Sequence, residues 1–106
     1  MANNFGDAQA TISNNSLTDV VTASNKSLVI AGTISNTHTS SVNVTLKKYD
    51  NGTTTAFTIL NNIPLPSGSS LELPKIVLNT SDKVQAQSDH ASGHITVALQ
   101  MLTDVS

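Results

Sequence analysis

Residues 27–49, SLVIAGTISNTHTSSVNVTLKKY, constrain the fold more than any other part of this chain. Apolar residues alternate with polar or small ones on both sides of a run of Ser, Thr, Asn and His. They are Leu28, Ile30 and Ile34 before the run and Val42, Val44 and Leu46 after it. A period of two is typical of half-buried strands. The stretch therefore predicts two strands joined by a polar turn.

The same alternation recurs along most of the chain. Strands are predicted at residues 9–13, 19–23, 27–36, 41–50, 54–60, 70–73, 76–78, 83–88 and 93–102. The predicted inward residues of the last two strands are Val84, Ala86, Ile95, Val97, Leu99 and Met101. About seven to nine short strands, with no apolar helical stripe, favour an all-β fold. We expect a single antiparallel β-sandwich, immunoglobulin-like or jelly-roll-like, with a small barrel as the alternative.

Turn residues divide these strands. Asn51-Gly52 predicts a hairpin with a type I′ turn, because both residues accept a positive φ. Pro64 and Pro66 lack the backbone donor of a ladder hydrogen bond, so residues 63–69 are expected to interrupt pairing. Residues 1–8 are polar and are predicted to form an extended, flexible N-terminal arm. Residues 9–106 are predicted to form the sandwich domain.

Composition narrows the possible partners. Only 11% of the residues are charged, against about 25% in an average soluble protein. Such a surface suits either a sandwich kept soluble by hydroxyls and amides or a subunit of a larger assembly. Aromatic residues make up 3%, so the core must be aliphatic. A net charge of −2, no arginine and few aromatic rings argue against nucleic-acid binding.

Targeting and redox signals are also missing from the sequence. No cysteine is present, so neither a disulfide framework nor a thiolate metal site is expected. No apolar run approaches the length of a membrane span. The first ten residues show neither the basic nor the apolar region of a signal peptide. We expect synthesis in a cytoplasm without a conventional export signal, and no membrane partner.

The three histidines are the first candidates for a metal site. His90 and His94 are four residues apart, a spacing that would face one metal from a helix, but this region is predicted as loop and strand around Gly93. With His38 from a distant loop, and Asp89 adjacent, they could form a three-ligand zinc site. The favoured interpretation is that they are solvated loop histidines, so no metal ligand and no cofactor are predicted.

Enzymatic chemistry finds no better candidate. Ser92 lies near His94 and Asp89 in sequence, but no Gly-x-Ser-x-Gly elbow surrounds it. Glu72 is the only glutamate, and no phosphate-binding or dinucleotide motif is present. The chain is therefore predicted not to be an enzyme and to have no catalytic residue.

Sugar recognition is a further possibility that the residues leave open. Tyr49 and Phe57 flank the Asn51-Gly52 turn and could meet across the hairpin. Asparagine is plentiful, but aromatic platforms are few.

Several segments together resemble small virion proteins of tailed bacteriophages, cyanophages among them. They are VVTA at residues 20–23, LVIAGTISN at 28–36, SVNVTL at 41–46, IPLPSGSSLEL at 63–73 and VLNTSDKVQAQS at 77–88. The similarity extends over about residues 18–102 and consists of β-sandwich patterns. The chain differs from long fibre proteins because it has no repeated shaft or coiled-coil segment.

The resemblance implies a non-enzymatic structural component of the virion, with a capsid decoration or cement protein favoured over a neck or tail accessory. Its partners would be major capsid or neck and tail subunits, and it is expected to form a homo-oligomer, a trimer. No functional residues carry over, because such proteins work through their surfaces. The alternatives are a receptor- or glycan-binding tip domain of a tail or head fibre, and a stand-alone adhesin or immunoglobulin-like module from a bacterium.

Overall fold

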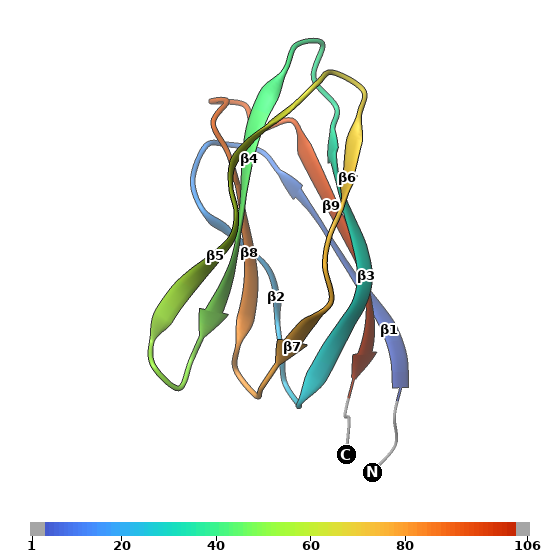
Figure 1. The fold of residues 1–106 in the computed structure, drawn as a ribbon, viewed down its shortest axis with the longest axis vertical. Coiled ribbons are helices and arrows are strands. Elements are labelled where there is room, and N and C mark those ends of the chain that lie inside the picture. The colour runs from blue at the N-terminus through green and yellow to red at the C-terminus, as the bar shows by residue number, and fades with distance from the viewer. Residues whose placement is uncertain (1–3, 104–106) are drawn as a thin grey trace.

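The computed structural model describes residues 4–103, which form nine antiparallel strands in two facing sheets (Figure 1). The strands are β1 (Asn4–Ile12), β2 (Thr18–Thr22), β3 (Ser27–Asn36), β4 (Val42–Asp50), β5 (Thr55–Leu65), β6 (Ser70–Glu72), β7 (Ile76–Leu78), β8 (Lys83–Ser88) and β9 (Ile95–Thr103). The predicted all-β antiparallel sandwich is confirmed.

The strand order identifies which kind of sandwich this is. The first sheet has the order β1-β9-β3-β6, and β7 also pairs with β3; the second sheet has the order β2-β8-β4-β5. Pairing is nested, because β1 meets β9, β2 meets β8, β3 meets β6 and β7, and β4 meets β5. The chain therefore forms one long antiparallel hairpin rolled into two sheets. This is the jelly-roll arrangement, the second of the two expected sandwiches.

The core between the sheets is aliphatic, as predicted. Its fully buried side chains include Ile12, Val29, Ile34, Val44, Leu46, Leu78, Val84, Ala86, Ile95, Val97 and Leu99. Within residues 4–103 no aromatic side chain is buried. Burial of each large aliphatic side chain contributes about 1.5–3 kcal/mol. Many of them are needed because no large ring fills the space between the sheets.

The inward face of β3 differs from the prediction. Leu28, Ile30 and Ile34 have the spacing of one face, yet Leu28 and Ile30 are only half-buried while Val29 and Ile34 are buried. The β3–β9 register shifts between Val29 and Ala31. This β-bulge inserts one residue, so the alternation of faces reverses at Ile30. Two apolar side chains of β3 consequently lie on the outer face of the first sheet.

Strand β5 runs further than predicted and passes through Pro64 to Leu65. Pro64 lies opposite Asn43 of β4. Pro64 has no backbone N–H to donate. Because β5 is an edge strand and pairs only with β4, this missing donor interrupts no second ladder. The ladder is instead irregular around Leu46, and Asn62 has a φ of 53°.

The β4–β5 connection is not the predicted two-residue type I′ turn. Residues 51–54 all lie in the turn, and the positive φ falls on Thr54, at 51°, and not on Gly52. The Asp50 carboxylate accepts hydrogen bonds from the Gly52 N–H (3.2 Å) and the Thr53 hydroxyl (3.0 Å). The Asp50 carboxylate thus stabilises the longer turn, because it accepts hydrogen bonds from two residues that lie inside that turn.

Tyr49 and Phe57 do not meet across this hairpin. Tyr49 lies opposite Ala56, and Phe57 lies opposite Lys48. Successive residues of a strand point to opposite faces, so the two rings lie on different faces of the sheet.

The N-terminal residues also differ from the expected arm. Residues 4–8 belong to β1, where Phe5 lies opposite Leu102 and Ala8 lies opposite Leu99. This part of the strand is hard to recognise in the sequence because most of its residues are polar. Its Ala8 is half-buried and packs against the core. Residues 1–3 lie outside the described residues.

A buried carboxylate organises the turns at the end of the sandwich where β4 meets β5. Asp82 is 1% exposed, and its two oxygens accept hydrogen bonds from the N–H groups of Asn51 (2.9 Å) and Asn79 (3.0 Å). The Lys48 ammonium lies 3.7 Å from the same carboxylate. Asp82 thus joins the β4–β5 and β7–β8 turns.

Within residues 4–103 no helix has the length and apolar character to span a membrane.

Replacement of Val97 by Asp is expected to unfold most of the protein, because Val97 is fully buried. An unpaired buried charge costs several kcal/mol against a typical total stability of about 5–15 kcal/mol. Urea denaturation followed by circular dichroism measures the loss. Thr96→Asp, on the outward face of the same strand, is the control and should lower stability by about 1 kcal/mol or less. Equal losses in the two variants would contradict the assigned face of β9.

Candidate functional site

The outer face of the first sheet carries a row of apolar side chains near the two termini. Leu102 of β9 lies opposite Phe5 of β1 and Leu28 of β3, and Leu28 in turn lies opposite Val77 of β7. Directly opposed residues share a face of a sheet. The side chains of Phe5 and Val77 are 83% and 52% exposed, and the other two are half-buried. We call Phe5, Leu28, Val77 and Leu102 the apolar row.

A hollow of about 340 Å³ adjoins this row on the same face. It lies where β6 gives way to β7 and is lined by Ile30, Ala31, Gly32, Thr33, Glu72, Leu73, Lys75 and Gln100. Ile30 reaches this face because of the β3 bulge. Apolar surface with a charged rim is a common character of protein-binding faces.

A second hollow, of about 370 Å³, is polar. Its lining consists of Thr45, Asn61, Asn62, Gln87, Ser88 and Asp89. Every lining side chain can donate or accept a hydrogen bond, and none is aromatic.

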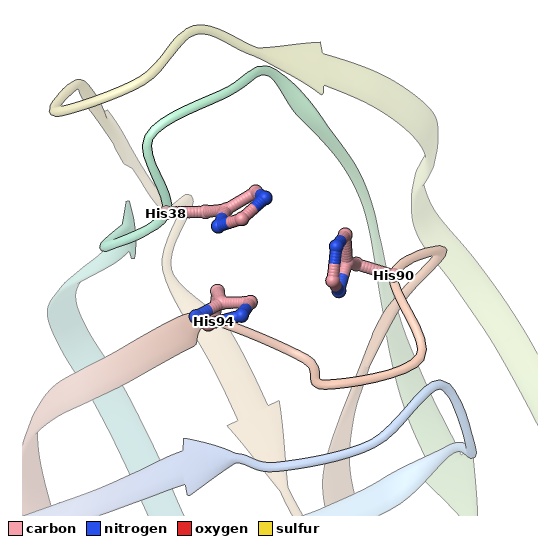
Figure 2. A group of neighbouring side chains, drawn as sticks. All are labelled: His38, His90 and His94. Atoms are coloured by element: carbon pink, nitrogen blue, oxygen red, sulfur yellow. The ribbon is translucent and has the colours of Figure 1, made fainter.

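The three histidines gather at the opposite end of the sandwich from the termini (Figures 1 and 2). His38 lies in the β3–β4 loop, and His90 and His94 lie in the β8–β9 loop. One ring nitrogen from each lies within 4.8 Å of one from each of the others, and all three side chains are half-buried. The sequence did not favour this cluster, because His38 and His90 are 52 positions apart and no local spacing links them.

The imidazole rings of this histidine cluster contact one another directly. The ring centres of His38 and His94 are 4.2 Å apart, and the two planes are nearly parallel at 18°. His90 lies 4.4 Å from His38 and 4.9 Å from His94, with its ring tilted against both. Figure 2 shows the three rings directed toward a common space.

Buried Asn36 holds the loop that carries His38. Its side chain is 2% exposed, and its oxygen accepts a hydrogen bond from the His38 N–H at 2.7 Å. Its amide nitrogen donates to the carbonyl oxygens of Ser40 (2.9 Å) and Leu65 (2.8 Å). The His38 carbonyl accepts a hydrogen bond from the Ser67 hydroxyl at 2.6 Å. One amide therefore fixes the path of the loop on both sides of His38.

Buried Ser88 plays the same part in the second loop. Its hydroxyl, on a residue that is 1% exposed, accepts a hydrogen bond from the His90 N–H (3.0 Å) and donates to the Gly93 carbonyl (2.7 Å). The His94 carbonyl accepts hydrogen bonds from the N–H (2.8 Å) and the hydroxyl (2.9 Å) of Thr37. The Thr37 bonds join the two loops beside the cluster.

The β8–β9 loop requires a glycine at position 93. Gly93 has a φ of 73°, and a Cβ at this position would lie 1.9 Å from the Ile12 carbonyl oxygen. His94 follows with a φ of 63°. Positive φ values cost energy for residues other than glycine, although histidine adopts them more often than most. This backbone turns the His94 ring back toward His38.

Asp89 and Ser92, the other candidates of the sequence, play different parts. The Asp89 carboxylate accepts a hydrogen bond from the Asn43 N–H at 2.9 Å and is not among the clustered ligand atoms. The Ser92 N–H donates to Nδ1 of His90 at 3.0 Å. Within the described residues, no hydrogen bond joins the Ser92 hydroxyl to a histidine ring. These contacts do not form a nucleophile–base pair.

The cluster lowers the pKa of His38. Partial burial of the ring disfavours its charged form, and positive charge on His94 and His90 acts in the same direction. His38, Asp89, His90 and His94 are the titratable groups of the loops at this end. His38 therefore takes up a proton less readily than a free histidine does.

This shift predicts that the metal-free protein loses stability in mild acid. A histidine whose pKa is lower in the folded state binds protons better when unfolded, so its contribution is complete above the ordinary value of 6.5. The contribution is lost as the pH falls from 6.5 through the lowered pKa. When the pH is lowered from about 7.5 to about 5, a range that spans the ordinary pKa of histidine, the melting temperature measured in a chelator should fall less for His38→Gln than for the wild type. Identical pH profiles would contradict the shift.

Comparison with known proteins found similarity in structure alone. No protein-family model and no curated protein matches the chain. Two crystal structures of a pentameric capsid protein isolated from metagenomic phage sequences are similar, one of them solved by iodide phasing. Sequence identity is 17% in both, with TM-scores of 0.48 and 0.47 over 94% of this chain. The chain spans only 60% and 62% of the length of those proteins.

Proposed function

We propose that this protein is a non-enzymatic structural component of a phage virion that binds other capsid or tail subunits. The apolar row is the observation that carries the proposal. Phe5 and Val77 expose large apolar surface at the two sides of the row, next to half-buried Leu28 and Leu102. Contiguous exposed apolar surface marks sites of protein–protein contact.

The charge distribution supports the same proposal. Charged residues are few, and none belongs to the apolar row, so a protein that covers the row removes little charge from water. A net charge of −2 causes little long-range repulsion between copies.

Strand β1 offers a second means of attachment. It is an edge strand of nine residues that pairs on one side, with β9. Asp7 is its only charged residue. A long edge strand with few charges can accept a strand from another chain. Because β1 contains Phe5, strand addition and burial of the apolar row would occupy adjoining surfaces.

The jelly-roll topology agrees with this proposal at the level of fold. Jelly rolls occur in viral capsid domains and also in lectins, so the topology by itself does not choose between them. Together with the resemblance of the sequence to small tailed-phage virion proteins, it favours the capsid decoration or cement role. The protein would then be found in the virion, as a homo-oligomer bound to major capsid subunits.

The apolar row can be tested by substitution. Phe5→Ser combined with Val77→Ser should weaken co-sedimentation with particles of the phage that encodes the protein by at least about tenfold, because exposed apolar anchors dominate such interfaces. Both side chains are largely exposed, so the melting temperature should change little. Phe57→Ser is the matched control, since Phe57 is also 52% exposed but lies on the second sheet.

Two results would refute the proposal. One is the absence of the protein from purified virions, measured by mass spectrometry. The other is equal binding of the double variant, the control and the wild type to particles.

Mass photometry of the free protein measures its oligomeric state, for which the sequence predicts a trimer and the capsid proteins of similar structure are pentamers.

A glycan-binding tip domain is the second candidate, and the polar hollow is the observation that favours it. The amides of Asn61, Asn62 and Gln87 and the carboxylate of Asp89 line one concave surface. Sugar hydroxyls bind such groups, although an aromatic platform is missing from the lining. A glycan array should show binding that Asn61→Ala removes and Phe5→Ser leaves intact. No binding to any glycan would exclude this candidate.

A further inference from the structure

We propose that His38, His90 and His94 bind a zinc ion through three imidazole nitrogens, with water at the fourth position. This site is separate from the apolar row and does not depend on the virion proposal. Three imidazoles with no thiolate or carboxylate suit zinc and its transition-metal neighbours. Calcium and magnesium prefer oxygen ligands and are not expected to bind.

The ring nitrogens lie close enough together for side-chain rotation to bring them to the separation that zinc requires. Ligand nitrogens about 2.0–2.1 Å from a tetrahedral zinc lie about 3.3 Å from one another. In the histidine cluster the corresponding atoms lie within 4.8 Å of one another. A contraction of this size needs only rotation of side chains, because the backbones already converge on one space (Figure 2).

The rings must turn before they can coordinate. A nitrogen lone pair lies in the plane of its ring, and the rings of His38 and His94 now face each other at 18°. All three rings are half-buried and border solvent, so rotation about their side-chain bonds is open to them. Metal binding should therefore convert the stacked pair into rings that radiate from one centre.

His90 must also change its hydrogen bond or its tautomer. Its Nδ1 accepts the Ser92 N–H, so the neutral ring carries its proton on Nε2. Coordination through Nε2 would move that proton to Nδ1 and break the contact with Ser92. Coordination through Nδ1 would put the metal in the place of the Ser92 N–H and leave the ring proton on Nε2. Either route exchanges one exposed hydrogen bond for a metal bond.

The surrounding loops are built to hold the ligands in place. Buried Asn36 and Ser88 each hydrogen-bond the backbone N–H of a cluster histidine, and Thr37 bonds the backbone of the third. Loops ordered before binding reduce the entropy that binding would otherwise cost. This preorganisation distinguishes the cluster from histidines that meet by chance on mobile loops.

The position of the cluster gives the metal a structural effect. The β3–β4 and β8–β9 loops both cross from one sheet to the other. A metal held by both loops would join these two crossings at one end of the sandwich. Hydrogen bonds to Asp82 would then join the turns at one end of the sandwich, and the metal would join the loops at the other end.

Titration of the full chain with Zn²⁺ by calorimetry tests the site. We expect one Zn²⁺ per chain and a rise in melting temperature of roughly 10 °C when free Zn²⁺ is about 100 times Kd. Co²⁺ should give the intense visible absorption of a tetrahedral site, which Zn²⁺ then abolishes. This spectrum is a direct readout of coordination and does not depend on any variant being folded.

Single variants identify the ligands. His38→Gln, His90→Gln and His94→Asn should each weaken binding by more than about tenfold. Asparagine is chosen at position 94 because it tolerates the positive φ there. Asp89→Asn is the matched control in the same loop; it keeps an acceptor for the Asn43 N–H and should leave Zn²⁺ affinity nearly unchanged.

The proposal is overturned if wild-type protein shows no Co²⁺ spectrum of tetrahedral type and no Zn²⁺-dependent rise in melting temperature. It is equally overturned if folded His38→Gln and His94→Asn proteins bind Zn²⁺ as tightly as the wild type. In either case the histidine cluster would be a stack of imidazoles without a metal.

Discussion

The antiparallel register of β3 and β9 at the centre of the first sheet determines most of what is distinctive in this protein. At one end of the pair Asn36 lies opposite Ile95, and at the other Leu28 lies opposite Leu102. The first pairing places the residues that follow β3 beside those that precede β9, and so brings His38 to His94. The second creates the centre of the apolar row. Both candidate surfaces therefore depend on one ladder.

The two ends of the sandwich are organised by buried polar side chains that the aliphatic core could not replace. Turns leave backbone N–H and carbonyl groups without strand partners, and burying such groups unpaired is costly. Asp82 satisfies them at one end, and Asn36 and Ser88 satisfy them at the other. The core supplies the free energy of folding, whereas these three residues select one arrangement of the loops.

The strands were largely predictable, and the exceptions have local causes. The alternation correctly assigned the inward faces of β4, β8 and β9, because each runs without a bulge across its buried part. It failed on β3, where the bulge at Ile30 reverses the pattern, and on β5, which continues through Pro64 because an edge strand tolerates the missing donor. The type I′ turn predicted at Asn51-Gly52 was wrong for another reason, because Asp50 stabilises a longer turn.

The sequence alone determined that the chain is an all-β sandwich with an aliphatic core, because periodicity and composition act locally or on average. The tertiary structure decided the jelly-roll order, the apolar row and the histidine cluster, because each depends on pairing between residues far apart in the chain. His38 and His90 show the difference. As separate residues they resembled solvated loop histidines, and closure of β3 on β9 places their rings 4.4 Å apart. No pattern within either loop contains that distance.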